Sequence, residues 1–241
     1  MSKDESNIND TLLIIKMLTE ILKQFEQKRK ELIRDGQWGK NAVADCFEPC
    51  AKEILCNGFF LVNNKYIIDL GAIELYYHEE EGDIKDYIMY HTNAHSSKSK
   101  LFELNRGFPY FKFGSFNLHQ SGVDVTFENP KEKYRASFLI RSYRVIREEN
   151  ELNDFTIPFD KCSTHIFDDM FFNGIMFDKQ NELSMEWVKC QKQGDIEKVP
   201  RKNVTKREIK YEDDKKRYVI VKSDEPDLRP WQFKRKYIIE K

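Results

Sequence analysis

The chain has 241 residues, of which 40% are hydrophobic and 13% aromatic, and its net charge is −1. This length and apolar content are enough to fill a core, so we expect a globular protein. No stretch approaches the roughly 20 apolar residues that cross a bilayer, and the polar start MSKDESNIND lacks the pattern of a signal peptide. These features exclude a strongly electropositive protein and a helical membrane protein, and they predict a cytoplasmic one.

Two helices are predicted at the N-terminal end. Residues 8–34 repeat apolar side chains at helical spacing and stop before Asp35-Gly36. Residues 43–56, VADCFEPCAKEILC, form the second helix, with Pro49 near its start or at a kink, and Asn57-Gly58 closes it. We therefore expect residues 1–40 to form an amphipathic helical addition packed on a body of residues 41–241.

The rest of the chain reads mainly as strands separated by turn signals. Predicted strands cover 59–64, 65–77, 122–128, 135–146, 207–212, 217–223 and 234–241. A further helix is predicted over residues 160–175, which end in Asn173-Gly174. Because no internal repeat or low-complexity linker divides this part, it predicts one α+β domain with an antiparallel or mixed sheet.

The five cysteines do not have the spacing of a disulfide framework. Three of them, Cys46, Cys50 and Cys56, fall in the predicted second helix, so we expect reduced thiols in the core. The CFEPC segment lacks a second pair of ligands at matching spacing, and we predict no metal site.

Charge is unevenly distributed along the chain. Residues 189–241 carry 17 basic and 10 acidic residues, a net +7, so the preceding part carries a net −8. The last quarter is therefore the candidate surface for a polyanion. The alternative is that alternating Lys and Glu residues solvate exposed strands.

The segment GAIELYYHEEEGDIKDYIMYH, residues 71–91, places a carboxylate and an aromatic ring two residues apart on a predicted strand. Side chains two apart on a strand point to the same face. Glu74 and Tyr76 are therefore expected to point together toward whatever lies above the sheet.

The order of several segments resembles the alkyladenine (3-methyladenine) DNA glycosylase family. The matching segments are AKEILCNGFFLV, GAIELYY, LFELNRGFPYFKFG, RASFLIRSYRV, HIFDDMFFNGIMFD and DLRPWQF, within residues 43–235. The resemblance implies an α+β fold with a mixed, largely antiparallel curved sheet, similar to the C-terminal domain of formyltransferases. It also implies that a nucleotide is rotated out of DNA before its base is removed.

Carried onto this chain, the resemblance implies that Glu74 is the catalytic glutamate. It implies contacts to the flipped nucleotide for six further residues, namely Tyr76, Tyr77, His91, Tyr110, Asp124 and Arg141. Phe113 or Phe116 would be the wedge that fills the vacated stack. The acidic EEEGD insertion lengthens the loop before His91, so His95 is an alternative to it.

The expected activity is that of a monofunctional DNA glycosylase that hydrolyses the N-glycosidic bond of a damaged or modified base, a purine. Glu74 would accept a proton from the attacking water. The sequence offers no isolated lysine on an apolar face as a nucleophile, so we favour simple hydrolysis over a covalent sugar adduct. We expect no cofactor, a monomer, duplex DNA bound through the minor groove as the partner, and no membrane.

Other interpretations remain open from sequence. The same fold could serve as a catalytically inactive nucleic-acid-binding module, or as a hydrolase of free nucleosides. Tyr110, Phe111 and Phe113 could be ordinary core aromatics. Arg141 lies in an apolar strand, and either a structural partner such as Asp124 or a DNA phosphate could balance its charge.

Overall fold

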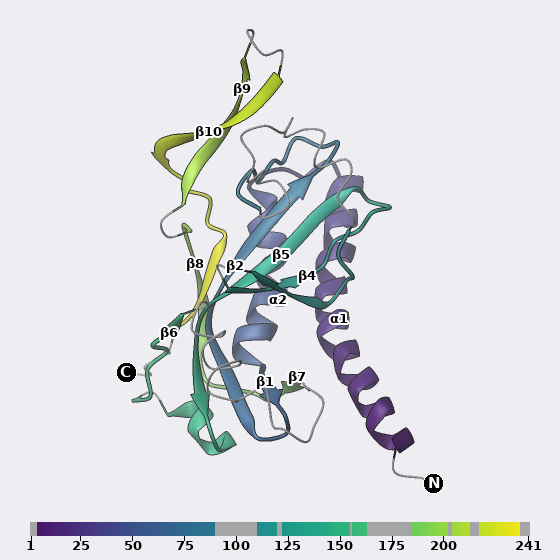
Figure 1. Ribbon diagram of the computed structural model, residues 1–241, viewed down its shortest axis with the longest axis vertical. Coiled ribbons are helices and arrows are strands. Elements are labelled where there is room, and N and C mark those ends of the chain that lie inside the picture. The colour runs from purple at the N-terminus through teal and green to yellow at the C-terminus, as the bar shows by residue number, and fades with distance from the viewer. Residues whose placement is uncertain are drawn as a thin grey trace.

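The computed structural model describes residues 4–89, 110–119, 122–154, 156–162, 185–201, 204–212 and 217–236. It is an α+β fold in which two N-terminal helices lie against a curled antiparallel sheet that forms a half-barrel (Figure 1). In the described part of the chain, no helix is long and apolar enough to cross a membrane.

The two helices are α1, Asp4–Arg34, and α2, Ala42–Cys56. They confirm both predicted N-terminal helices, and α1 begins four residues earlier than expected. Helix α1 ends at Arg34, and the chain then turns at Gly36, whose φ of 68° is readily adopted only by glycine. Pro49 lies inside α2 on its exposed side and does not end it.

In the part of the chain that the structure describes, nine strands form the main sheet. They are β1 (Gly58–Val62), β2 (Tyr66–Glu79), β3 (Ser115–His119), β4 (Gly122–Thr126), β5 (Tyr134–Ile146), β6 (Lys161–Cys162), β7 (Met185–Lys189), β8 (Asp195–Val199) and β11 (Gln232–Lys236). The order is β3-β4-β5-β2-β1-β7, with β6 beside β5 and β11 between β2 and β8. Among the described strands every pairing is antiparallel.

A second sheet has only two strands, β9 (Thr205–Glu212) and β10 (Arg217–Pro226). This hairpin extends beyond one end of the main body (Figure 1). It confirms the two strands predicted over 207–212 and 217–223. It belongs to the part of the chain with excess positive charge.

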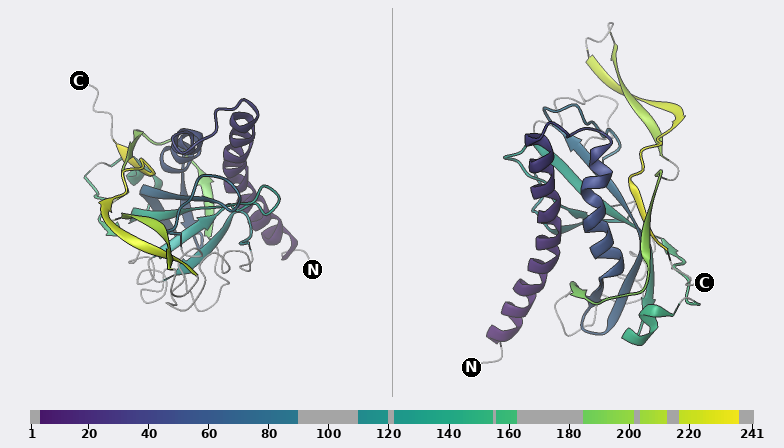
Figure 2. Two further views of the ribbon diagram at one scale, coloured as in Figure 1. Left: turned by 90° about the horizontal axis from the view of Figure 1, so that it is seen from above. Right: turned by 180° about the vertical axis from the view of Figure 1, so that it is seen from behind.

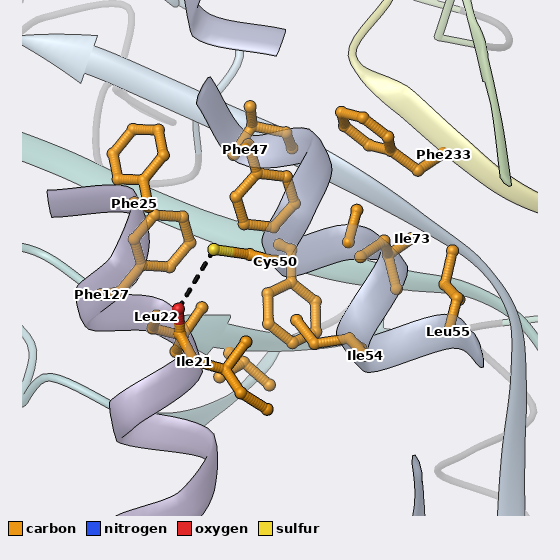
Figure 3. Packing of buried hydrophobic residues seen from close by; sticks show 14 of the residues in the cluster. Ile21, Leu22, Phe25, Phe47, Cys50, Ile54, Leu55, Ile73, Phe127 and Phe233 are labelled. Atoms are coloured by element: carbon orange, nitrogen blue, oxygen red, sulfur yellow. Dashed lines mark hydrogen bonds between the residues drawn. The ribbon is translucent and has the colours of Figure 1, made fainter. Parts of the chain in front are cut away.

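Both helices cover the same face of the main sheet (Figure 2). The core between the helices and the sheet is rich in aromatic rings, and Phe25 of α1 packs within it (Figure 3). Its ring is 5.4 to 6.4 Å from five others, those of Trp38, Phe47, Tyr77, Phe127 and Tyr134. Helix α1 is therefore part of the same core as the sheet.

The helical cysteines link the two helices. The Cys46 thiol donates to the carbonyl of Phe25. The Cys50 thiol donates to that of Ile21 (Figure 3). Burial raises the pKa of both thiols to about 12, so they stay protonated. Cys56 is also buried, and all five cysteines are free, which confirms the expectation of reduced core thiols.

Three expectations about elements need correction. The helix predicted over 160–175 is wrong at its start, because Lys161 and Cys162 form β6 and pair with Tyr143 and Ser142; residues 163–175 lie outside the described ranges. The strand predicted over 234–241 begins two residues earlier than expected, at Gln232, and residues 237–241 lie outside the described ranges. The sequence analysis did not predict β3, β6, β7, β8 or the 3-10 helix Glu149–Asn153.

Candidate functional site

The face of the sheet turned away from the helices carries polar side chains, and we call it the polar face. Alternate residues of β2, such as Ile73, Leu75 and Tyr77, point into the core. Residues aligned across antiparallel strands share a face. Two aligned rows therefore lie on the polar face, Gln232-Glu74-Leu139-Asp124-Asn117 and Tyr76-Ser137-Thr126-Ser115.

Glu74 is one of the buried acids of this face, with an exposed fraction of 0%. The Tyr76 hydroxyl donates a hydrogen bond of 2.5 Å to Oε1. Arg141 Nε lies 3.3 Å from Oε2, within ion-pair distance but without the alignment of a hydrogen bond. One carboxylate oxygen is thus fixed by a donor, while the other has no hydrogen bond.

The electrostatics of this pair favour a basic carboxylate beside a protonated phenol. Burial raises the pKa of Glu74, and Arg141 and Tyr76 offset only part of that effect. Burial and the neighbouring Glu74 raise the pKa of Tyr76 well above its usual range. Tyr76 therefore stays protonated and remains the donor, and Glu74 takes up a proton more readily than an exposed glutamate.

Two neighbours of the pair also have buried polar atoms without a hydrogen bond. They are Gln232 Oε1, beside Glu74 on β11, and Ser137 Oγ, beside Tyr76 on β5. Orphaned buried polar atoms are rare and mark places for a water or ligand. Neither residue was predicted as a site residue from the sequence, although Gln232 lies in the segment DLRPWQF, which carries part of the family resemblance.

A hollow of about 300 Å³ opens on the polar face, and it is lined by two neighbours of Glu74, Arg141 and Gln232, but not by Glu74 itself. It forms where two strands each carry an extra residue, Gly71 in β2 and Arg141 in β5. Both residues line it, together with Gln232 and Phe159. A Cβ added at Gly71 would come within 2.5 Å of the Phe159 ring, so the Phe159 wall needs glycine there.

One side of the Tyr76 ring is occupied by Arg201, whose Cζ is 5.1 Å from the ring centroid. Arg201 is held in place by Asp86 at 2.8 Å and by Asp227, and it also lies 5.2 Å from the Trp231 ring. Any flat ligand that stacks on Tyr76 is therefore restricted to the opposite side of the ring.

His78 follows Tyr76 on the polar face and is buried. The Asp86 backbone N–H donates to its Nδ1 at 3.2 Å. Burial lowers the pKa of His78 to about 4, so the ring is neutral near pH 7 and acts as an acceptor. His78 thereby connects the end of β2 to the loop that carries Asp86.

The structure brings several of the expected site residues to the polar face. Arg141 forms an ion pair with Glu74, so Glu74 is the structural partner that balances its charge. Asp124 is buried in the same row as Glu74, with Leu139 between them. Tyr110 lies over the Arg135 guanidinium at 4.1 Å, and Arg135 pairs with His78, four residues along β2 from Glu74.

Other expected site residues are not brought to Glu74. Tyr77 was proposed as a stacking ring, but it is fully buried on the opposite face, with its hydroxyl bonded to Arg29 and Glu79. Phe113 and Phe116 were proposed as a wedge, but both pack against the core on the helix side. The Tyr77 assignment is corrected, and the wedge role of Phe113 or Phe116 stays a prediction. His91 and His95 lie outside the described residues.

Comparisons with protein-family models, with curated proteins and with solved structures found no match for this chain. Within the described ranges, no group of three or more His, Cys, Asp or Glu residues is arranged to hold a metal ion.

Proposed function

We propose that this protein is a monofunctional DNA glycosylase that hydrolyses the N-glycosidic bond of a damaged or modified purine. The observation that supports this most is the Glu74 carboxylate. Its Oε1 is fixed by Tyr76, its Oε2 has no hydrogen bond to the described residues, and its neighbours Arg141 and Gln232 line a hollow. The fold implied by the resemblance to alkyladenine DNA glycosylases is part of the same proposal.

The chemistry needs only water and one base. The water oxygen bonds to the sugar carbon C1′ while the C1′–N bond breaks, and the bonding electrons leave with the base, which is then protonated. Glu74 Oε2 accepts the proton of the water, and the carboxylate stabilises positive charge on the sugar. The raised pKa of Glu74 makes it a better proton acceptor than an exposed glutamate.

Capture of the flipped base falls to Tyr76. In this proposal the base stacks on the side of the ring opposite Arg201. Stacking of this kind contributes about 1 to 3 kcal/mol per base, which offsets part of the cost of flipping. Because Glu74 is fully buried, a side chain has to move before the sugar can reach it. We expect Arg141 to shift, since its side chain is 29% exposed and is held by one contact.

A lysine nucleophile is not part of this proposal. Lys192 is the buried lysine on the polar face, and its Nζ is 2.6 Å from Asp69 with no exposed side-chain surface. A nucleophile that forms a covalent adduct with the sugar has to reach C1′. The ion pair keeps Lys192 away from the hollow, which favours simple hydrolysis over strand cleavage.

The direct test uses a panel of oligonucleotides, single-stranded and duplex, with alkylated, deaminated or naturally modified bases. Abasic sites are detected by cleavage in alkali. We expect abasic sites with at least one modified purine and no strand cleavage before alkali. Release of base from free nucleosides alone would identify a nucleoside hydrolase instead. Binding of DNA with no release from any substrate would identify an inactive binding module.

A further inference from the structure

The hollow beside Glu74 has a strongly cationic lining. Arg141, Lys234 and Arg235 contribute to it, and none of the described lining residues is acidic. The remaining polar groups come from Ser142 and Gln232, and the Phe159 ring forms an apolar wall. Such a lining attracts an anion and repels a cation.

Two of these cations have donors that no group in the described part of the chain uses. Arg141 is held only through Nε, so its two Nη atoms have no hydrogen-bond partner among the described residues. The Nζ of Lys234 likewise has no hydrogen bond or ion pair to the described part of the chain. A planar guanidinium and an ammonium group around one space are the donors that phosphate oxygens accept from.

The third cation is rigidly anchored and belongs to a cluster with excess positive charge. The Arg235 side chain is buried and bonded to Asp69 at 3.1 Å and to the Gln193 carbonyl at 2.7 Å. The same Asp69 also pairs with Arg144 at 2.9 Å and Lys192 at 2.6 Å, so one carboxylate faces three cations. Arg235 lines the hollow, and the cluster to which it belongs, with Asp69, Arg144 and Lys192 outside the lining, carries two excess positive formal charges.

We infer that this hollow is a binding site for a phosphate group, formed by Arg141, Lys234 and Arg235. In the proposed glycosylase it holds the backbone phosphate next to the nucleotide whose sugar lies at Glu74, since Arg141 and Gln232 border both places. This placement rests on the proposed function, whereas phosphate binding by the hollow does not. The protein should accordingly prefer phosphorylated nucleotides or nucleic acid to free nucleosides.

The first experiment compares Lys234→Gln with the control Lys236→Gln, which removes the same charge from the same strand at an exposed residue outside the hollow. Oligonucleotide affinity is measured by fluorescence anisotropy over a range of salt concentrations. We expect Lys234→Gln to weaken binding about tenfold and to reduce the salt slope by about one, and Lys236→Gln to have a much smaller effect. Equal effects of the two variants would overturn the site.

The second experiment uses the unmodified protein and needs no activity. Calorimetry compares a nucleoside 5′-monophosphate, the matching nucleoside and inorganic phosphate. We expect the monophosphate to bind at least about tenfold more tightly than the nucleoside and inorganic phosphate to compete with it. Equal affinities would overturn the phosphate site. Binding of monophosphate but not of oligonucleotides would reject the DNA backbone as its source, and neither result depends on base release.

Discussion

The Tyr76 hydroxyl and the Glu74 carboxylate, two residues apart on β2, meet at 2.5 Å on the face of the sheet opposite the helices. The bond fixes one carboxylate oxygen and leaves the other directed toward Arg141 and without a hydrogen bond. Because Tyr76 donates to the ionised form of Glu74, it lowers the pKa of that carboxylate and opposes the effect of burial.

Replacing this hydroxyl should change the pH dependence of base release. In Tyr76→Phe the ring remains but the hydrogen bond is lost, so the pKa of Glu74 rises further. Only ionised Glu74 can accept a proton, and the acid limb of the pH–rate profile should therefore move to higher pH. The rate on its plateau should fall about tenfold, as expected for losing one hydrogen bond to a charged group.

The matched control is Tyr66→Phe, at the start of the same strand, whose hydroxyl has no hydrogen bond to the described residues. Its profile should superimpose on that of the unmodified protein. A Tyr76→Phe profile with an unshifted acid limb would show that Tyr76 does not act on the catalytic group.

His78 should make stability sensitive to acid. Its pKa is lowered from 6.5 to about 4 by burial, so folding disfavours the protonated ring. This contribution is present above pH 6.5 and is lost as the pH falls through that value toward 4, a loss of about 3 kcal/mol at roughly 1.4 kcal/mol per unit.

The measurement is urea unfolding of the unmodified protein and His78→Gln at pH about 7.5 and about 4.5. Glutamine keeps an acceptor for the Asp86 N–H but does not titrate. The variant should therefore lose less stability between the two pH values, by roughly 2 to 3 kcal/mol. An identical loss in both proteins would mean that His78 can be protonated in the folded state without cost.

Local patterns were enough to predict much of the fold. Helical spacing predicts α1 and α2, and alternation predicts that Glu74 and Tyr76 share a face, as their hydrogen bond confirms. The strands β3, β7 and β8 are only five residues each, so any alternation of apolar residues in them is too short to mark a strand.

The site was harder to predict because its geometry depends on irregular pairing and on distant segments. Asp69 and Glu74 are five residues apart, which alternation assigns to opposite faces, yet the extra residue at Gly71 brings both to the polar face. Arg201 and Gln232 come from the last quarter of the chain. No local pattern indicates that they lie beside a strand near residue 74.

Helix α1 should be essential to the fold, although its sequence reads as an N-terminal addition. Phe25→Ala removes the ring at the centre of the aromatic core and should lower the free energy of unfolding by about 3 to 5 kcal/mol. The exposed neighbour Gln24→Ala is the control and should change it by less than about 0.5 kcal/mol. A cost near zero for Phe25→Ala in urea unfolding would mean that α1 is a separable addition.

The most direct test of the account is single-turnover base release by Glu74→Gln, on the oligonucleotide that the unmodified protein processes best. Glutamine nearly preserves the shape of the side chain but cannot accept the proton of the attacking water. We expect release to slow by about 10² to 10⁴-fold while DNA affinity stays within about threefold, with exposed Glu20→Gln on α1 as an unaffected control. Release by Glu74→Gln at the rate of the unmodified protein would contradict the hydrolytic role of Glu74.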